Sequence, residues 1–196
     1  AVTIKSTSGY IAVEGVEVRG APGPLAPGLY QQDNFNLTYT GTWTNLPGAV
    51  YASGSSIYSS TQGNQLTFSI RDATGFSVIL SRFATGVSAN MRVCYTRQSN
   101  GDTNCNVATD GVVSTVSPTG LQQNYYLFSY YGLPSQNVTN TGPETYNITV
   151  THNGPTGTYL ILDAIQVYDD FSTSLMVSTT PGTPNGQPVL YDTTTE

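Results

Sequence analysis

The side chains that could carry acid–base or nucleophilic chemistry are few and do not form a catalytic motif. His152 is the only histidine and lies in the turn THNGPTG, and the chain contains no G-x-S-x-G nucleophile motif. We expect His152 to be a surface turn residue. Glycoside cleavage needs two facing carboxylates, one with a raised pKa. Of the 12 acidic residues only Asp163, within LILDAIQV, has strongly apolar neighbours. The pattern predicts a chain that is not an enzyme.

Aromatic side chains indicate a different kind of site, because sugars bind on exposed rings bordered by hydrogen-bonding groups. In the segment NYYLFSYY, strand alternation sends Tyr126 and Phe128 to one face and Tyr125 and Leu127 to the other. Two alternatives stay open: a buried tryptophan that anchors the fold, and tyrosines that contact a neighbouring unit. The candidates for a sugar-binding surface are Trp43, Tyr125, Tyr126, Tyr130 and Tyr131.

Two cysteines, Cys94 and Cys105, flank the segment TRQSNGDTN, in which Asn100-Gly101 is a strong hairpin-turn signal. Two strands leaving such a turn hold the sulfurs within bridging distance, so we predict a disulfide that closes the hairpin. The alternative, a metal or redox pair, lacks further Cys or His ligands. A disulfide points to an oxidising compartment, and therefore to an extracellular protein, either secreted or on the cell surface.

Three N-glycosylation sequons occur, at Asn36 in NLT, Asn137 in NVT and Asn147 in NIT. Chance matches are ordinary in a chain this rich in Asn and Thr. The Ser/Thr-rich segment 171–183 is an alternative carrier, of O-linked sugars. Glycans would hydrate a surface that has few charges.

The composition excludes several partners. Charged residues make up 9% of the 196 residues, against roughly 25% in typical soluble domains. The net charge is −6 with only 6 Lys+Arg, so there is no basic stripe for nucleic acid or for an anionic membrane surface. No run approaches the roughly 20 apolar residues that span a bilayer, so we expect no membrane insertion.

Apolar and polar residues alternate with a period of two, and no stretch has a helical face. Gly, Pro, Asn and Asp separate the segments. The pattern predicts an all-β, antiparallel β-sandwich. The expected strands are VTIKS, YIAVEGVEV, NLTYTGTW, QLTFSI, GFSVILSRF, MRVCYTR, VVSTV, NYYLFSYY, YNITVTH and YLILDAIQV.

Two segments occur twice. YIAVEGVEV at 10–18 resembles YLILDAIQV at 159–167, and PGLYQQDNF at 27–35 resembles PVLYDTTTE at 188–196. Between the copies lie segments rich in Pro and Gly or in Ser, Thr and Pro, which are typical of linkers. We therefore predict a hairpin at 1–18 that ends a preceding repeat, a linker at 19–28, a sandwich domain at 29–170, a linker at 171–187, and the start of a following repeat or a donated strand at 188–196.

The terminal segments need partners, because an isolated two-stranded hairpin is marginal in water. We expect them to share strands with copies of the chain or with neighbouring repeats. Head-to-tail contacts of this kind do not close and so build a fibre. The expected assembly residues are Val2, Ile4, Tyr10, Ile11, Val13, Val16, Val18, Val189, Leu190 and Tyr191.

The body of the chain, from about Leu29 to Asp169, resembles the galactose-binding-like jelly-roll repeats of large extracellular surface proteins in bacteria such as the Chloroflexota. The resemblance rests on NLTYTGTW, LTFSIRDATGFSVIL, MRVCYTRQSNGD and YNITVTHNGPTGTYLILDAIQV. It extends to carbohydrate-binding modules and implies a jelly-roll sandwich. The cysteine hairpin departs from the shorter turn of that family.

The resemblance also implies a structural calcium ion near the first and last strands. Its weak candidate ligands are Asp33 and Asp163, together with Asp169 and Asp170. The alternatives are that these are solvated linker acids, and that Asp163 accepts hydrogen bonds near the end of its strand. No other cofactor is expected.

These observations together predict a non-enzymatic structural subunit or repeat of an extracellular filament, sheath or surface stalk, which assembles head to tail through strand sharing. The alternative is a carbohydrate-binding module of a secreted multidomain protein. Saturable sugar binding by a monomer would favour the module.

Overall fold

The computed structural model describes residues 21–48, 54–82, 89–105, 112–114, 122–169, 176–178 and 189–191, with the side chains of 82, 112–114, 122–127, 176–178 and 189–191 left out. The described chain contains strands and turns and no helix, as the alternation predicts. Accordingly, none of the described segments is a helix that could cross a bilayer.

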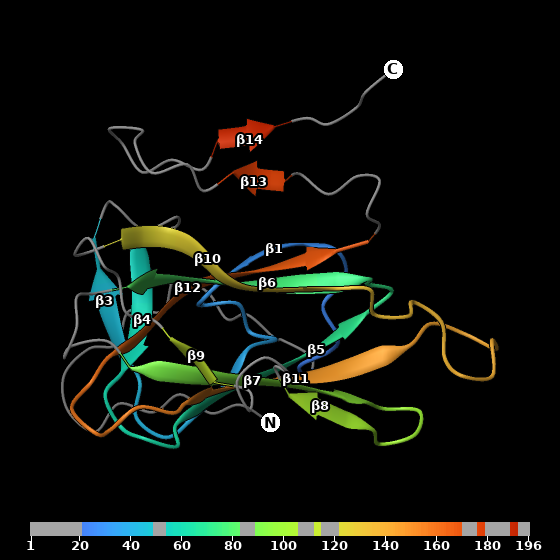
Figure 1. Cartoon of the computed structure of the whole chain (residues 1–196), viewed down its shortest axis with the longest axis horizontal. Helices are drawn as coiled ribbons and strands as arrows, with labels where there is room; N and C mark the ends of the chain where they lie inside the picture. Colours follow the sequence, from blue (N-terminus) through green and yellow to red (C-terminus); the bar gives the residue numbers. More distant parts are fainter. Residues whose placement is uncertain are drawn as a thin grey trace, which may run out of the picture.

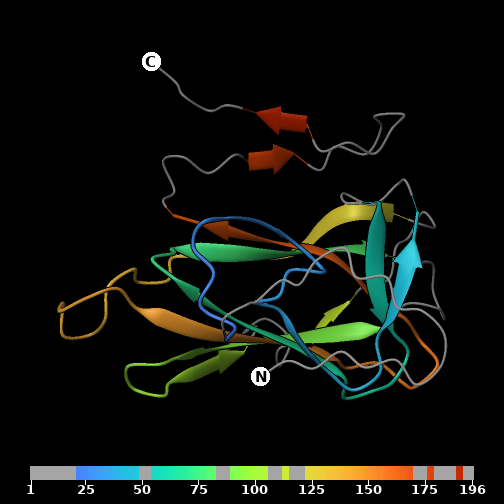
Figure 2. The same cartoon turned by 180° about the vertical axis from the view of Figure 1, so that it is seen from behind.

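Two antiparallel sheets of six strands face each other (Figures 1 and 2), which confirms the predicted β-sandwich. The first, the β12 sheet, has the order β10-β6-β12-β4-β3, and β1 also pairs with β12. The second, the β11 sheet, has the order β2-β5-β11-β7-β8, and β9 also pairs with β7. The β12 sheet contains β1 (Gly28–Gln31), β3 (Thr44–Pro47), β4 (Ser55–Ser59), β6 (Gly75–Arg82), β10 (Gln122–Tyr131) and β12 (Leu160–Tyr168). The β11 sheet contains β2 (Thr38–Thr40), β5 (Gln65–Arg71), β7 (Asn90–Arg97), β8 (Thr103–Cys105), β9 (Val112–Ser114) and β11 (Thr145–His152).

The core lies between the two sheets and is built by alternate residues of each strand. Along β5 and β11 buried residues alternate with half-buried or exposed ones. The rings of Phe68 in β5 and Phe76 in β6 meet edge to face across the layers, with centroids 6.2 Å apart. The core includes Leu66, Phe68, Ile70, Phe76, Val78, Leu80, Met91, Val93, Ile148, Val150, Leu160, Leu162, Ile165 and Val167.

The described part of the predicted linker 19–28 belongs to the sandwich, so the prediction of a free linker is wrong there. Leu25 is 1% exposed; its N–H donates to the Ser69 carbonyl (2.7 Å), and its own carbonyl accepts from the Arg71 N–H (3.0 Å). Gly28 already pairs with Val167 as the first residue of β1. Proline removes a backbone donor only at its own position, so the leucine between prolines still bonds to the sheet edge.

The predicted assembly strands are described only at the C-terminal end. Val2, Ile4, Tyr10, Ile11, Val13, Val16 and Val18 lie outside the described residues. β14 (Val189–Tyr191) pairs with β13 (Met176–Ser178), which lies within the predicted linker 171–187 of the same chain. Pairing of this strand with another copy stays a prediction.

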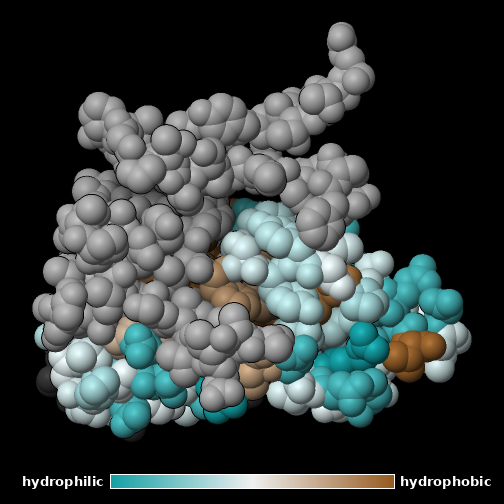
Figure 3. Space-filling view, in the orientation of Figure 1, coloured by the Kyte–Doolittle hydropathy of each residue, from teal (hydrophilic) through white to brown (hydrophobic). Residues whose placement is uncertain are grey.

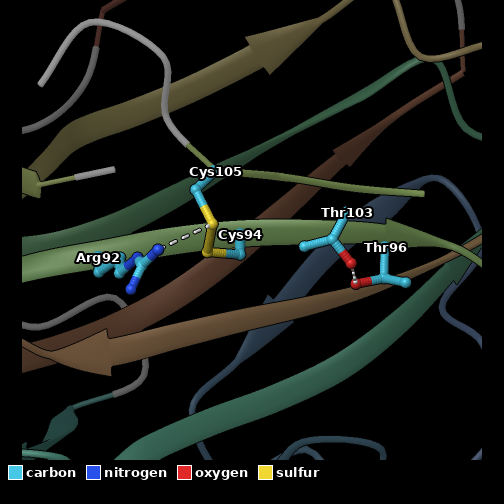
Figure 4. The surroundings of a disulfide bond; sticks show 5 residues. All are labelled: Arg92, Cys94, Thr96, Thr103 and Cys105. Carbon is cyan, nitrogen blue, oxygen red and sulfur yellow. Dashed lines mark hydrogen bonds between the residues drawn. A yellow bond between two sulfur atoms is a disulfide. The ribbon is translucent and has the colours of Figure 1, made fainter. Parts of the chain in front are cut away.

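The predicted Cys94–Cys105 disulfide is confirmed, with an S–S distance of 2.05 Å (Figure 4). The two cysteines are direct cross-strand partners in β7 and β8. Next to them the Thr96 and Thr103 hydroxyls lie 2.8 Å apart, and Arg92 Nη2 donates to Cys105 Sγ at 3.5 Å. The disulfide therefore holds a three-residue edge strand on its neighbour.

Candidate functional site

Trp43 packs against the core instead of presenting its ring to solvent. The indole is half-buried, lies 5.2 Å from the Tyr39 ring, and donates from Nε1 to the Thr40 carbonyl at 3.1 Å. Burial raises the pKa of Tyr39, and the negative charge of Asp33 raises it further. The surroundings of Trp43 therefore match the alternative in which it anchors the fold.

Tyr130 also faces the interior. Its ring centroid lies 4.7 Å from that of Tyr95, and the Tyr95 hydroxyl donates to the Tyr130 hydroxyl at 2.7 Å. This bond joins β7 of one sheet to β10 of the other. Burial, with a smaller contribution from this hydrogen bond, raises the pKa of Tyr95 to about 12. Tyr130 thus stabilises the contact between the sheets.

Tyr131, the next residue, points outward and is 40% exposed. Its ring lies 5.2 Å from that of Tyr168, at an interplanar angle of 40°. The two tyrosines are the cross-strand partners of Gly75, one on each side of β6. A Cβ on Gly75 would lie 2.3 Å from the Tyr130 carbonyl oxygen and 3.1 Å from Tyr131 Cδ1. Because glycine has no Cβ, Gly75 leaves room for the Tyr131 and Tyr168 rings to come into contact.

Tyr168 was not among the predicted site residues. It is the last residue of β12, and its hydroxyl lies 2.9 Å from Ser77 Oγ, which lies 2.6 Å from Ser129 Oγ. Strand alternation after the buried Val167 could have placed Tyr168 on the outer face, but not beside Tyr131, which is 37 residues earlier in the chain.

Of the remaining predicted aromatic residues only the backbone is described. Tyr125 pairs with Leu80 and Tyr126 with Ile79, and a bulge or irregularity interrupts the register on either side of them. Their part in sugar binding stays a prediction.

An open hollow of about 540 Å³ lies at the end of the sandwich where β12 and β10 end. Neither Tyr131 nor Tyr168 lines the hollow, but the chain leads from both tyrosines to it: Asp169 follows Tyr168, and Ser135 comes four residues after Tyr131. The surface at this end, on the right of Figure 3, is mostly hydrophilic. The lining residues are Asp72, Ser135, Gln136, Asn140, Thr141, Gly142, Pro143 and Asp169.

The loop between β10 and β11, which projects at the right of Figure 1, forms most of this lining. The Leu133 N–H donates to the Thr74 carbonyl (2.9 Å), and the Glu144 N–H donates to the Ser135 carbonyl (2.8 Å). Leu133 is 3% exposed and anchors the start of the loop. The lining groups are therefore held by backbone bonds at both ends of the loop.

Among the described residues the carboxylates do not gather into the predicted calcium site. Asp33 is exposed, Asp163 is fully buried at a bulge in β12, and Asp170 lies outside the described residues. Nowhere in the described ranges do three or more His, Cys, Asp or Glu side chains gather. Calcium takes 6–8 oxygen ligands, usually including several carboxylates. The described acids Asp33, Asp163 and Asp169 do not provide such a cluster.

His152 is buried, so the prediction of a surface turn residue is wrong. β11 continues through His152, which pairs with Met91, and alternation from Ile148 and Val150 turns its ring inward. Nε2 lies 2.7 Å from the Thr158 carbonyl oxygen and donates to it. The histidine closes the turn 153–158.

No protein-family model matches the chain, and no curated protein matches it. Among solved structures it is similar to a Paenibacillus xanthan lyase (TM-score 0.45, 16% identity, over 79% of this chain and 14% of that one). It is also similar to a family 35 carbohydrate-binding module from Clostridium thermocellum (TM-score 0.42, 14% identity, over 72% of this chain and 98% of that one). A third similar structure is CsCBM6-3 from Clostridium stercorarium, in complex with cellobiose (TM-score 0.39, 17% identity, over 76% of this chain and 98% of that one). Scores this low do not bear on which ligand the present chain takes.

Proposed function

We propose that the chain is a non-catalytic carbohydrate-binding module that takes a glycan at the hollow beside Tyr131 and Tyr168. The observation that carries the proposal is the exposed Tyr131 ring, which lies against Tyr168, the chain neighbour of the hollow-lining Asp169. Ligand sites combine an apolar surface with a few convergent polar groups, in pockets of about 300–1,000 Å³. A sugar ring would stack on the tyrosine while its hydroxyls bond to the amide, hydroxyl and carboxylate groups of the lining.

The non-catalytic part of the proposal is supported by the surroundings of the acids. Asp72 and Asp169 both line the hollow, but both are exposed. A catalytic carboxylic acid is usually kept protonated by an apolar, water-poor environment. The two acids that are buried in the described part of the chain do not line the hollow: Asp163 lies within β12, and Glu144 accepts from the Ser99 hydroxyl at 2.8 Å.

An extracellular location is part of the proposal and is supported by the disulfide. The described structure does not favour the filament role, because β14 pairs with β13 of its own chain. Strand sharing through residues 1–18 stays a prediction.

The test compares two tyrosines of similar exposure on the same sheet. A glycan array identifies a ligand for the full chain, and calorimetry then measures its Kd for Tyr131→Ala and Tyr159→Ala. Tyr159 is 38% exposed and lies at the opposite end of β12. We expect Tyr131→Ala to weaken binding at least about tenfold, which corresponds to about 1.4 kcal/mol, and Tyr159→Ala to bind like the parent. Absence of any glycan ligand, or equal effects of the two changes, contradicts the proposal.

A further inference from the structure

The outer face of the β11 sheet carries mainly hydroxyl and amide side chains. On β5 and β11 the core takes alternate residues such as Phe68 and Ile148, so Ser69, Asn147 and Thr149 point outward. On the described strands β2, β5, β7 and β11 no acidic side chain lies on this face. The outward residues of these strands are Thr38, Thr40, Gln65, Thr67, Ser69, Arg71, Asn90, Arg92, Cys94, Thr96, Thr145, Asn147, Thr149 and Thr151.

Asn147 lies in the central strand of this face, and its amide is held in one orientation. Oδ1 accepts from Ser69 Oγ at 2.6 Å and from Gln98 Nε2 at 2.8 Å. The residue is exposed, and within the described ranges no hydrogen bond uses its Nδ2. The two donors therefore direct Nδ2, the atom that carries an N-linked glycan, toward solvent. Thr149, the third residue of the sequon, lies on the same face.

The other two sequons differ from Asn147, Asn137 because its Nδ2 is bonded and Asn36 because its side chain is half-buried. Asn137 Nδ2 donates to Thr141 Oγ1 at 3.2 Å, while its Oδ1 accepts from Thr139 Oγ1 (2.9 Å) and from the Thr141 N–H (3.0 Å). This side chain organises the loop that lines the hollow. Asn36 is half-buried, and its Oδ1 accepts from the Gly23 N–H at 2.9 Å.

We propose that Asn147 is the N-glycosylation site of this chain and that its glycan covers the outer face of the β11 sheet. In this modification the bond between Nδ2 and the anomeric carbon forms as the bond from that carbon to phosphate breaks in a phosphate-activated oligosaccharide donor, and the amide loses one proton. The glycan would hydrate a face that has few charges. It would lie on the sheet opposite Tyr131, so the modification stands independently of the proposed sugar binding.

The test is glycopeptide mapping of the chain purified from its natural source, with enzymatic release of N-glycans in heavy-oxygen water. Release converts a glycosylated asparagine to a labelled aspartate. We expect the label at position 147 and unmodified Asn36 and Asn137. An unlabelled Asn147 overturns the proposal.

A pair of variants produced in the same host tests the link to the sequon. Thr149→Ala removes the sequon and leaves Asn147 with both of its donors, whereas Thr149→Ser keeps the sequon. Complete loss of the glycan mass in Thr149→Ala and its retention in Thr149→Ser are expected, with matching melting temperatures showing that both variants fold. Glycan at Asn147 in both variants, or in neither, contradicts the proposal.

Discussion

The β12 sheet presents a tyrosine pair at each end of its outer face. Tyr131 and Tyr168 lie at one end with ring centroids 5.2 Å apart, and Tyr58 and Tyr159 lie at the other with centroids 5.5 Å apart. Tyr131 and Tyr159 are almost equally exposed, at 40% and 38%. Judged from exposure and ring contact alone, the two pairs are equivalent.

Their surroundings distinguish them. The first pair closes over Gly75, its Tyr168 hydroxyl bonds to Ser77, and Asp169, which follows Tyr168, lines the polar hollow. The second pair lies beside a turn closed by short bonds, including the Gly157 N–H to the Ser60 carbonyl at 2.7 Å. An exposed aromatic ring becomes a binding surface when polar groups converge beside it, so the comparison favours the first end.

Filling the space at Gly75 should have the largest effect. We expect Gly75→Ala to abolish glycan binding and to lower the free energy of unfolding by about 1–3 kcal/mol, because the new Cβ would lie 2.3 Å from a backbone oxygen. Urea unfolding and calorimetry measure the two effects. The control is Gly23→Ala, where no heavy atom lies within 4 Å of the new Cβ. A Gly75→Ala chain as stable as this control would show that the strands yield without cost.

Removing the hydroxyl that holds Tyr168 should have a smaller effect. Ser77→Ala deletes the contact to the Tyr168 hydroxyl and leaves the Ser129 hydroxyl one partner fewer. A hydrogen bond of this kind contributes about 1 kcal/mol, so we expect roughly fivefold weaker glycan binding.

Ser81→Ala is the matched control for this change. Ser81 is in the same strand and is equally buried, but its Oγ has no hydrogen-bond partner among the described residues. Equal Kd values for the two variants would mean that the orientation of Tyr168 does not matter.

Alkaline pH should act on the first end through Tyr95, which bonds to Tyr130 beneath Tyr131. The pKa of Tyr95 rises from 10.0 to about 12 on folding, chiefly through burial. The folded chain therefore keeps this proton at pH values where the unfolded chain loses it. The stabilisation is complete below about pH 10 and declines as pH rises toward 12.

Tyr95→Phe should accordingly flatten the decline in the urea midpoint between about pH 10 and pH 12. Tyr39, whose pKa is also raised, keeps its own contribution in the variant. If the urea midpoints of parent and variant decline in parallel with rising pH, proton retention by Tyr95 does not contribute to stability.

Local patterns were sufficient for the fold class and for the hairpin. Alternation identifies β5 and β11 because one-sided burial imposes a period of two. β6 and β12 are buried on both faces and are identified by their apolar runs VIL and LIL. Asn100-Gly101 between two cysteines identifies the disulfide, because a tight turn places its flanking residues opposite each other. The same reasoning failed for the segment around Leu25, where three nearby prolines suggested a linker. It failed again for His152, because the end of a strand is not marked in the sequence.

What the sequence determined by itself is most of the long strands, the cysteine pair and the low charge, since each follows from neighbours along the chain; the short strands β3 and β4 were not predicted. What only the tertiary structure decided is which aromatic residues share a site. The Trp43 and Tyr130 side chains pack against the core of the sandwich, whereas the Tyr131 ring contacts the Tyr168 ring across Gly75. Such a meeting depends on the order and register of strands far apart in sequence, which the packing of the whole sandwich sets.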